Sequence, residues 1–228
     1  MRFLCLHGVG TNSKCLVISL CAKSCSPAPL RYEVGDGHTY DFVEGIFPYE
    51  LAPEIRDIVP ADDQGFSYFD PDSVPASLQA VKDLEHFIER EGPYDGVLAF
   101  SQGMMLACTL LMRKMQENKA LPFKCAIFFS PRMAPLVHED LCRGIFTEID
   151  PQDLREKIDI PTTLVWGSAD PFATKAVELQ QLFLPGCLST VVHEGGHEVP
   201  GYAFKSALAQ TVKVIRRTTD QAGRAGSA

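Results

Sequence analysis

The stretch GVLAFSQGMM, residues 96–105, joins an expected buried strand to an expected helix through a single serine. Residues 96–101 form an almost continuous apolar run, which is typical of a strand covered on both faces of a parallel sheet. Ser101 and Gly103 occupy the last two fixed positions of the nucleophile-elbow pattern G-x-S-x-G, but Ala99 stands where the first glycine is usual. Taken alone, the stretch fits a helix-capping serine as well as a nucleophile, so the rest of the chain must decide.

Short apolar runs alternate with helical patterns along the chain, which indicates an α/β fold whose mostly parallel sheet carries helices on both faces. Two irregular stretches broken by prolines, residues 48–75 and 133–161, are expected to be short lid-like insertions. We expect one domain over residues 1–217 and a flexible tail at 218–228. The sequence predicts strands at residues 2–7, 40–46, 96–101, 125–130, 162–167 and 189–194, and helices at 74–90, 102–118, 173–183 and 202–217.

The composition is that of a globular protein with an acidic balance. The 228 residues carry a formal net charge of −8, which argues against nucleic acid or an anionic membrane as the main partner. The 8 cysteines include no C-x-x-C pair, and several lie inside apolar runs, where a free thiol behaves as a small hydrophobic group. We therefore expect reduced thiols, a cytoplasmic location, no metal site and no cofactor.

One segment imitates a targeting signal, because Lys14 precedes an apolar run that ends at Ala22. The run is too short to cross a membrane. Cleavage after it would also remove residues 3–12, which contain a loop that we assign to the active site below. A signal peptide is therefore not expected.

Polar side chains follow three of the predicted strands in an order that points to serine hydrolysis. In open α/β sheets, ligand chemistry gathers beyond the carboxyl ends of the strands. Ser101, Asp170 and His197 each follow a different strand, and their order along the chain is the one expected of α/β-hydrolases. Ser101 needs His197 to accept its proton, and His197 needs Asp170 to orient its ring and stabilise its charged form.

Each of these residues has an ordinary structural alternative: a helix cap for Ser101, a turn residue for Asp170 and a loop histidine for His197. Their joint occurrence at three strand ends favours the catalytic interpretation. The glycines of HGVGTNS, residues 7–13, also suggest a dinucleotide fold, but Ser13 stands where that motif needs its third glycine.

The oxyanion of a tetrahedral intermediate needs backbone donors close to the nucleophile. We expect these to be the N–H groups of Val9, in the loop after the first strand, and of Gln102, at the start of a helix. For the substrate pocket we expect apolar side chains from the insertions and strand ends, namely Phe66, Tyr68, Phe69, Met104 and Phe172. For the three aromatic residues at 66–69, burial in the core is an equally weighted alternative.

Five blocks of the sequence resemble the fungal serine hydrolase family of α/β-hydrolases, the esterase and thioesterase group that includes LovG-type enzymes. The resemblance covers residues 2–217, and by it Ser101, Asp170 and His197 match the catalytic residues of the family. The five blocks are FLCLHGVGTNS (3–13), YDFVEG (40–45), GVLAFSQG (96–103), WGSADP (166–171) and EGGHEVP (194–200).

The resemblance implies hydrolysis of a thioester or ester, with release of a polyketide or other acyl chain from the acyl carrier domain of a polyketide synthase in fungal secondary metabolism. A short-chain carboxylesterase and a non-catalytic ligand-binding protein on the same fold are the alternatives. Residues 14–29 depart from the family pattern, because an apolar, cysteine-rich segment replaces the expected amphipathic helix. We expect a locally remodelled helix there, or a segment wrongly retained in the reading frame.

Overall fold

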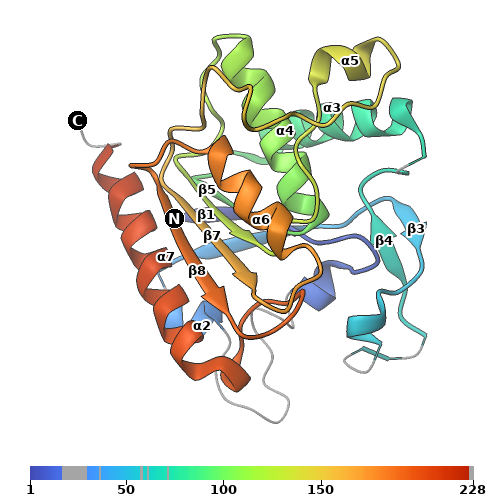
Figure 1. Ribbon diagram of the computed structural model, residues 1–228. Helices are drawn as coiled ribbons and strands as arrows, with labels where there is room; N and C mark the ends of the chain where they lie inside the picture. Colours follow the sequence, from blue (N-terminus) through green and yellow to red (C-terminus); the bar gives the residue numbers. More distant parts are fainter. Residues whose placement is uncertain (17–29, 36, 57–58, 61, 71, 226–228) are drawn as a thin grey trace.

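The computed structural model describes residues 1–16, 30–35, 37–56, 59–60, 62–70 and 72–225. Its centre is a six-stranded sheet in the order β2-β1-β5-β6-β7-β8, in which every neighbouring pair is parallel (Figure 1). The strands are β1 (Arg2–Leu6), β2 (Thr39–Val43), β5 (Gly96–Phe100), β6 (Cys125–Phe129), β7 (Thr162–Gly167) and β8 (Leu188–His193). The predicted strands and the predicted fold class are thus confirmed.

Helices cover both faces of this sheet, as expected for strands that are apolar on both sides. Alternate side chains of the central strands enter two separate cores, one packed against α3, α4 and α6 and the other against α2 and α7. The helices are α2 (Leu30–Val34), α3 (Val74–Glu91), α4 (Gln102–Gln116), α5 (His138–Cys142), α6 (Ala173–Leu179) and α7 (Lys205–Ala225).

The order of the strands places a switch point between β1 and β5. The chain passes from β1 to β2 on one side, and later returns to β5 on the other side of β1. Loops leaving the carboxyl ends of two such strands diverge and open a crevice, where open α/β sheets bind their ligands. The loop after β1 and the turn that carries Ser101 therefore meet at this point.

The first irregular stretch contains more structure than the sequence indicated. β3 (Phe47–Tyr49) and β4 (Gly65–Ser67) form an antiparallel pair, and Pro53–Ile55 form a 3₁₀ turn between them. Thr11 forms an isolated bridge with Phe66, which attaches this pair to the loop after β1. The insertion therefore lies against the switch point.

The departure from the family pattern lies mainly outside the described residues. Residues 13–16 are helical, and the Asn12 side chain accepts a hydrogen bond from the Cys15 N–H at 2.8 Å, as a residue that caps a helix does. Residues 17–29 are not among the described residues, so the expectation of a remodelled or wrongly retained segment stays a prediction there.

The C-terminal helix corrects the predicted tail. α7 extends to Ala225, whereas the sequence predicted a helix that ends at residue 217 and a flexible segment over 218–228. The extension is held because its small side chains face the sheet: Ala222 is fully buried, and the Thr218 hydroxyl lies 2.7 Å from the Thr163 hydroxyl of β7. Residues 226–228 lie outside the described residues.

The bond between Thr163 and Thr218 gives a test of this longer helix. Thr218→Val is expected to lower the free energy of unfolding by about 1–3 kcal/mol, because it leaves a buried hydroxyl without a partner. The double variant Thr163→Val/Thr218→Val is expected to lose less than the two single variants together, because both polar groups are removed. Urea unfolding measures all three. Strictly additive losses would show that the two hydroxyls do not interact.

Candidate active site

Ser101 lies in a strained turn between β5 and α4. Its φ of 51° and ψ of −112° are uncommon for a residue other than glycine, and such strain is typical of a nucleophile elbow. The Ser101 N–H donates to the Phe129 carbonyl of β6 at 2.9 Å, which fixes the turn to the sheet. A Cβ atom at Gly103 would lie 2.6 Å from the Leu6 carbonyl oxygen, so the helix needs glycine there to pack against β1.

Three side chains from three strand ends form one hydrogen-bonded relay. His197 Nε2 lies 3.0 Å from Ser101 Oγ, and His197 Nδ1 lies 2.8 Å from Asp170 Oδ2. The Asp170 side chain is 1% exposed and that of His197 is 16% exposed. With the ring proton on Nδ1 donated to the carboxylate, Nε2 is free to accept the serine proton. The residues that the sequence predicted as a triad thus come together.

Backbone hydrogen bonds join the loop that carries Asp170 to the loop that carries His197. The Ser168 N–H donates to the His193 carbonyl at 2.7 Å, and the Ala169 N–H donates to the Gly195 carbonyl at 3.0 Å. The buried His193 ring accepts the Gly195 N–H at Nδ1. His193 therefore supports the loop from beneath, which agrees with its predicted place inside the strand.

The loop after β1 presents a free backbone donor beside the serine. The Gly8 carbonyl accepts hydrogen bonds from the Thr11 hydroxyl and the His7 ring, which closes a tight turn. The Gly10 N–H donates to the Phe66 carbonyl at 2.9 Å. Within the described part of the chain, the Val9 N–H has no hydrogen-bond partner, so it is available to a ligand in the position expected of an oxyanion donor.

The second expected donor is the N–H of Gln102, the first residue of α4. The first N–H groups of a helix have no partner within it, and among the described residues this one bonds to no other group. The Gln102 side chain turns the other way. Its Oε1 accepts from the Tyr68 N–H at 3.1 Å, and its Nε2 donates to Ser67 Oγ at 2.8 Å.

His7 supports this loop, a role that the sequence did not indicate. Its fully buried ring accepts the Gly45 N–H at Nε2, 2.8 Å away, and donates from Nδ1 to the Gly8 carbonyl at 2.7 Å. The His7 N–H donates to the Tyr68 hydroxyl, which in turn donates to the Val43 carbonyl. Burial raises the pKa of Tyr68 well above its usual value, so the hydroxyl stays protonated as this bridge requires.

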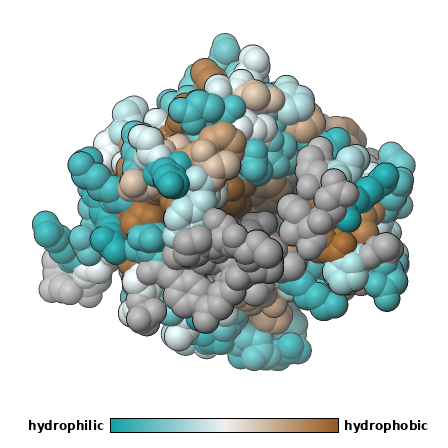
Figure 2. All heavy atoms as spheres, turned by 90° about the horizontal axis from the view of Figure 1, so that it is seen from below, coloured by the Kyte–Doolittle hydropathy of each residue, from teal (hydrophilic) through white to brown (hydrophobic). Residues whose placement is uncertain are grey.

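Ser101 and His197 open into a cavity of about 790 Å³, a volume suited to a small organic ligand. Its walls come from the strand-end loops and from the β3–β4 insertion. The carboxyl ends of the strands point toward the lower side of Figure 1, and the view from below in Figure 2 shows hydrophobic surface in a hollow near the middle of this side. The lining residues are Val9–Thr11, Cys15, Leu16, Tyr49–Arg56 without Glu54, Phe100, Ser101, Arg132, Pro171, Phe172 and Gly196–Val199.

Four of the five predicted pocket residues lie elsewhere, and only Phe172 lines the cavity. Phe69 and Met104 are buried in the core between the sheet and α4, where apolar side chains at this depth pack against one another. Tyr68 is committed to the bridge under the loop after β1. Phe66 belongs to β4 and contributes its backbone to the contact with that loop.

The cavity residues that the sequence did not predict come mainly from the first insertion. Its proline-rich character indicated a binding loop, but the prediction chose the wrong half of it: residues around Tyr49 and Leu51 line the cavity, rather than the aromatic run at 66–69. Arg132 was missed as well, although it follows the end of β6 and so stands at a strand-end position.

The described part of the chain meets neither the requirements of a metal site nor those of a membrane-spanning helix. Among the described residues, no cluster of three or more His, Cys, Asp or Glu side chains has the arrangement of a metal site. No helix in the described part of the chain is long and apolar enough to cross a bilayer.

The corrected pocket can be tested with a pair of alanine variants. Leu51→Ala is expected to lower kcat/KM for an apolar acyl ester about tenfold, because it removes apolar contact with the substrate. Phe69→Ala is expected to lower the free energy of unfolding by about 3–5 kcal/mol and to leave KM unchanged while the protein remains folded. Ester hydrolysis and urea unfolding are measured on both variants. A raised KM for Phe69→Ala with little change in the free energy of unfolding would show that Phe69 contacts the substrate.

The serine hydrolase (FSH1) family model matches residues 1–207 of this chain. The chain is 34% identical to the protein named esterase FPY3 of Fusarium mangiferae over 203 residues, which cover 88% of either protein. It is 30% identical over 201 residues to hydrolase phiM of a fungal species (strain ATCC 74256), covering 87% of this chain and 86% of that protein.

Solved structures with the same fold include esterases and thioesterases. Esterase PE8 superposes with a TM-score of 0.57 at 18% identity, covering 95% of this chain and 92% of the other. The RedJ thioesterase from the prodiginine biosynthetic pathway of Streptomyces coelicolor superposes with a TM-score of 0.52 at 14% identity, covering 94% and 90%. This chain belongs to the serine hydrolase (FSH1) family and is a serine esterase or related hydrolase with the α/β-hydrolase fold.

Proposed function

We propose that this protein cleaves acyl thioesters or esters through an acyl-enzyme formed on Ser101. The observation that carries the proposal is the relay from Ser101 through His197 to Asp170, which opens directly into the cavity. A nucleophile, a base and a group that orients the base are the parts that acyl transfer requires. A binding protein needs none of them, so the complete relay weighs against the non-catalytic alternative.

In the first half of the reaction, Ser101 Oγ attacks the carbonyl carbon of the substrate while His197 Nε2 accepts the serine proton. Asp170 stabilises the imidazolium that results, and the N–H groups of Val9 and Gln102 donate to the carbonyl oxygen as it becomes an oxyanion. When the intermediate collapses, the bond to the leaving group breaks and His197 gives its proton to the departing thiol or alcohol. The acyl chain stays on Ser101 as an ester.

In the second half, water replaces the leaving group. His197 accepts a proton from the water molecule while the water oxygen attacks the acyl-enzyme carbonyl carbon. The N–H groups of Val9 and Gln102 donate to the second oxyanion. Collapse of this intermediate returns the proton to Ser101 Oγ and releases a carboxylic acid. The only co-reactant is water.

The preferred substrate is an acyl thioester carried by the acyl carrier domain of a polyketide synthase, and the acyl chain is a polyketide or a related product of fungal secondary metabolism. The family resemblance and the thioesterase named among the structures of the same fold support this choice. The net charge of −8 does not favour an acidic carrier, so docking depends on local contacts. A general short-chain carboxylesterase is the second candidate, favoured by the name esterase of the 34% identical relative.

We also propose a cytoplasmic location. Cys15, Cys108 and Cys125 are buried free thiols, and burial raises the pKa of Cys125 to about 12, which makes its reactive thiolate form scarce. Buried, unreactive thiols of this kind suit a reducing compartment.

The nucleophile can be tested with a fluorophosphonate probe. Wild-type protein is expected to be labelled and Ser101→Ala is not, with kcat lower on the order of 10⁶-fold in that variant. Asp170→Asn should keep the geometry but lower kcat about 10⁴-fold, because the His197 ring then holds the wrong tautomer. Ser168→Ala, an exposed serine in the loop after β7, is the matched control and should label normally. Labelling of Ser101→Ala at the wild-type rate would identify a different nucleophile.

The leaving group can be tested with a panel of acyl-N-acetylcysteamine thioesters and the p-nitrophenyl esters of the same acids. Each rate is divided by the rate of spontaneous hydrolysis, so that differences in leaving-group reactivity do not enter the comparison. We expect higher corrected kcat/KM values for the thioesters. A consistent preference for the oxygen esters would favour the carboxylesterase instead.

A further inference from the structure

One cation in the active-site cavity has no acidic partner. Arg132 is exposed, follows the end of β6 and lines the same cavity as Ser101 and His197. Within the described part of the chain, no carboxylate lies within 4.0 Å of its guanidinium group, and the guanidinium forms no hydrogen bond. An arginine left without a partner inside a ligand cavity keeps all its donors available to a bound anion.

The Arg132 side chain lies over an aromatic ring of the active site. Its guanidinium carbon lies 5.0 Å from the centre of the Phe172 ring, which is within the range of a cation–π interaction. The Phe172 ring contacts the His197 ring edge-on, with the centres 5.4 Å apart. The Phe172 ring thus lies between Arg132 and the catalytic base, and an anion bound by Arg132 would lie close to the reacting groups.

The other charged residues that line the cavity are already engaged. Arg56 and Glu50 form an ion pair at 2.5 Å, so neither presents a free charge. The Glu198 carboxylate accepts the Gly196 N–H at 3.2 Å and so bends back onto its own loop. Arg132 is thus the lining cation that has no ion-pair partner in the described structure.

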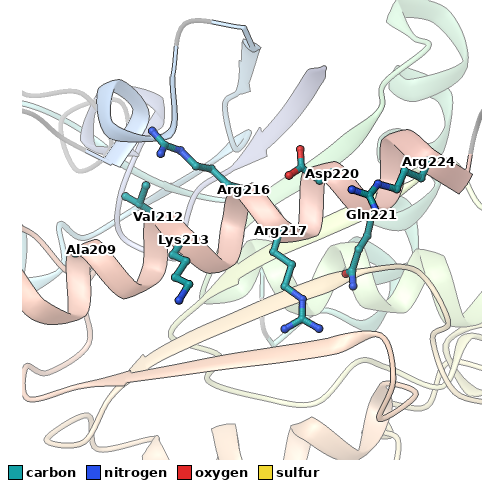
Figure 3. Close-up of a pocket in the computed structure, with 8 residues that line it drawn as sticks. All are labelled: Ala209, Val212, Lys213, Arg216, Arg217, Asp220, Gln221 and Arg224. Atoms are coloured by element: carbon teal, nitrogen blue, oxygen red, sulfur yellow. The ribbon is translucent and has the colours of Figure 1, made fainter.

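A larger group of cations lies on α7, but it is less suited to the substrate. Figure 3 shows Lys213 and Arg217 on one side of the helix, whereas Arg216 points to the other side, toward α2. Arg216 donates to the Glu33 and Val34 carbonyls of α2 at 2.5 and 3.3 Å. Because α7 follows the last strand, it runs back from the carboxyl ends of the strands, and none of these cations lines the cavity that contains Ser101.

We propose that Arg132 binds an anionic oxygen group of the substrate, a carboxylate or a phosphate, and so gives the hydrolase a preference for charged acyl thioesters. This inference rests on the proposed function. The planar guanidinium group can donate two parallel hydrogen bonds to either anion, which lysine does not do. The anion has two possible sources: a carboxylate on the acyl chain, or the phosphate of the phosphopantetheine arm that carries the thiol.

Two matched pairs of substrates separate these sources. The first pair is succinyl- and butyryl-N-acetylcysteamine, which differ in a carboxylate on the acyl chain. The second pair is butyryl-4′-phosphopantetheine and butyryl-pantetheine, which differ in a phosphate on the leaving group. For at least one pair, Arg132→Gln is expected to lower kcat/KM for the charged member about tenfold and to change the neutral member less than about twofold.

Three controls make the result specific. Arg132→Lys should keep part of the preference, because the charge remains but the paired donors are lost. Arg217→Gln on α7 removes an equal charge outside the cavity and should leave both ratios unchanged. Added salt should weaken the preference of the wild-type protein, because Arg132 is exposed.

The outcomes are distinct. A loss confined to the succinyl substrate assigns the anion to the acyl chain, and a loss confined to the phosphopantetheine substrate assigns it to the arm; either supports the proposal. Equal losses on charged and neutral members, or no loss in either pair, would overturn it while leaving the hydrolase intact. If wild-type protein hydrolyses none of the four thioesters, the thioesterase function itself fails and this inference fails with it.

Discussion

At Gly103, the first turn of α4 lies so close to β1 that a Cβ atom would come within 2.6 Å of the Leu6 carbonyl oxygen and 2.8 Å of the His7 carbonyl oxygen. The chain turns sharply as it leaves β5, with Ser101 at a positive φ, and this turn lets α4 begin directly against β1. The same approach brings the loop after β1 beside the serine: a Cβ atom at Gly8 would lie 3.2 Å from Ser101 Cβ. The nucleophile and its nearest backbone donors are therefore positioned by a single packing constraint.

The opposite side of the site depends on hydrogen bonds rather than on steric contact. Asp170 and His197 follow neighbouring strands, and backbone bonds from Ser168 and Ala169 join their two loops. The Ser130 hydroxyl, at the end of β6, donates to the Glu198 carbonyl at 3.2 Å and attaches the histidine loop to a third strand. The relay thus spans loops that are tied to one another as well as to the sheet, which keeps its distances short without a ligand.

Most of the fold and the three relay residues could be predicted because both follow from periodic or positional rules. Buried parallel strands are visible as apolar runs, and parallel strands bring their following residues to one edge. The pocket did not follow from such a rule: Tyr68 and Leu51 belong to the same irregular stretch, and only the packing around β1 decides that Tyr68 faces inward and Leu51 faces the cavity. The end of α7 was missed for a similar reason: Thr218 and Gly223 are weak helix formers, and contacts of Thr218 and Ala222 with the sheet hold the segment in place.

The residues that carry out the reaction and the residues that select the substrate therefore belong to different parts of the fold. Ser101, Asp170 and His197 follow the carboxyl ends of the strands, where the fixed spacing of the strands limits how far any of these residues can move. The cavity walls come largely from the insertion between β2 and α3, which is attached to the sheet edge through contacts such as the Thr11–Phe66 bridge and the Gln102 side chain. Loops of this kind tolerate changes of length and sequence better than strands do. Changes in the insertion can therefore alter the shape of the cavity without disturbing the relay, so the insertion and the charged residues at the rim are the parts of the chain that decide which substrate fits.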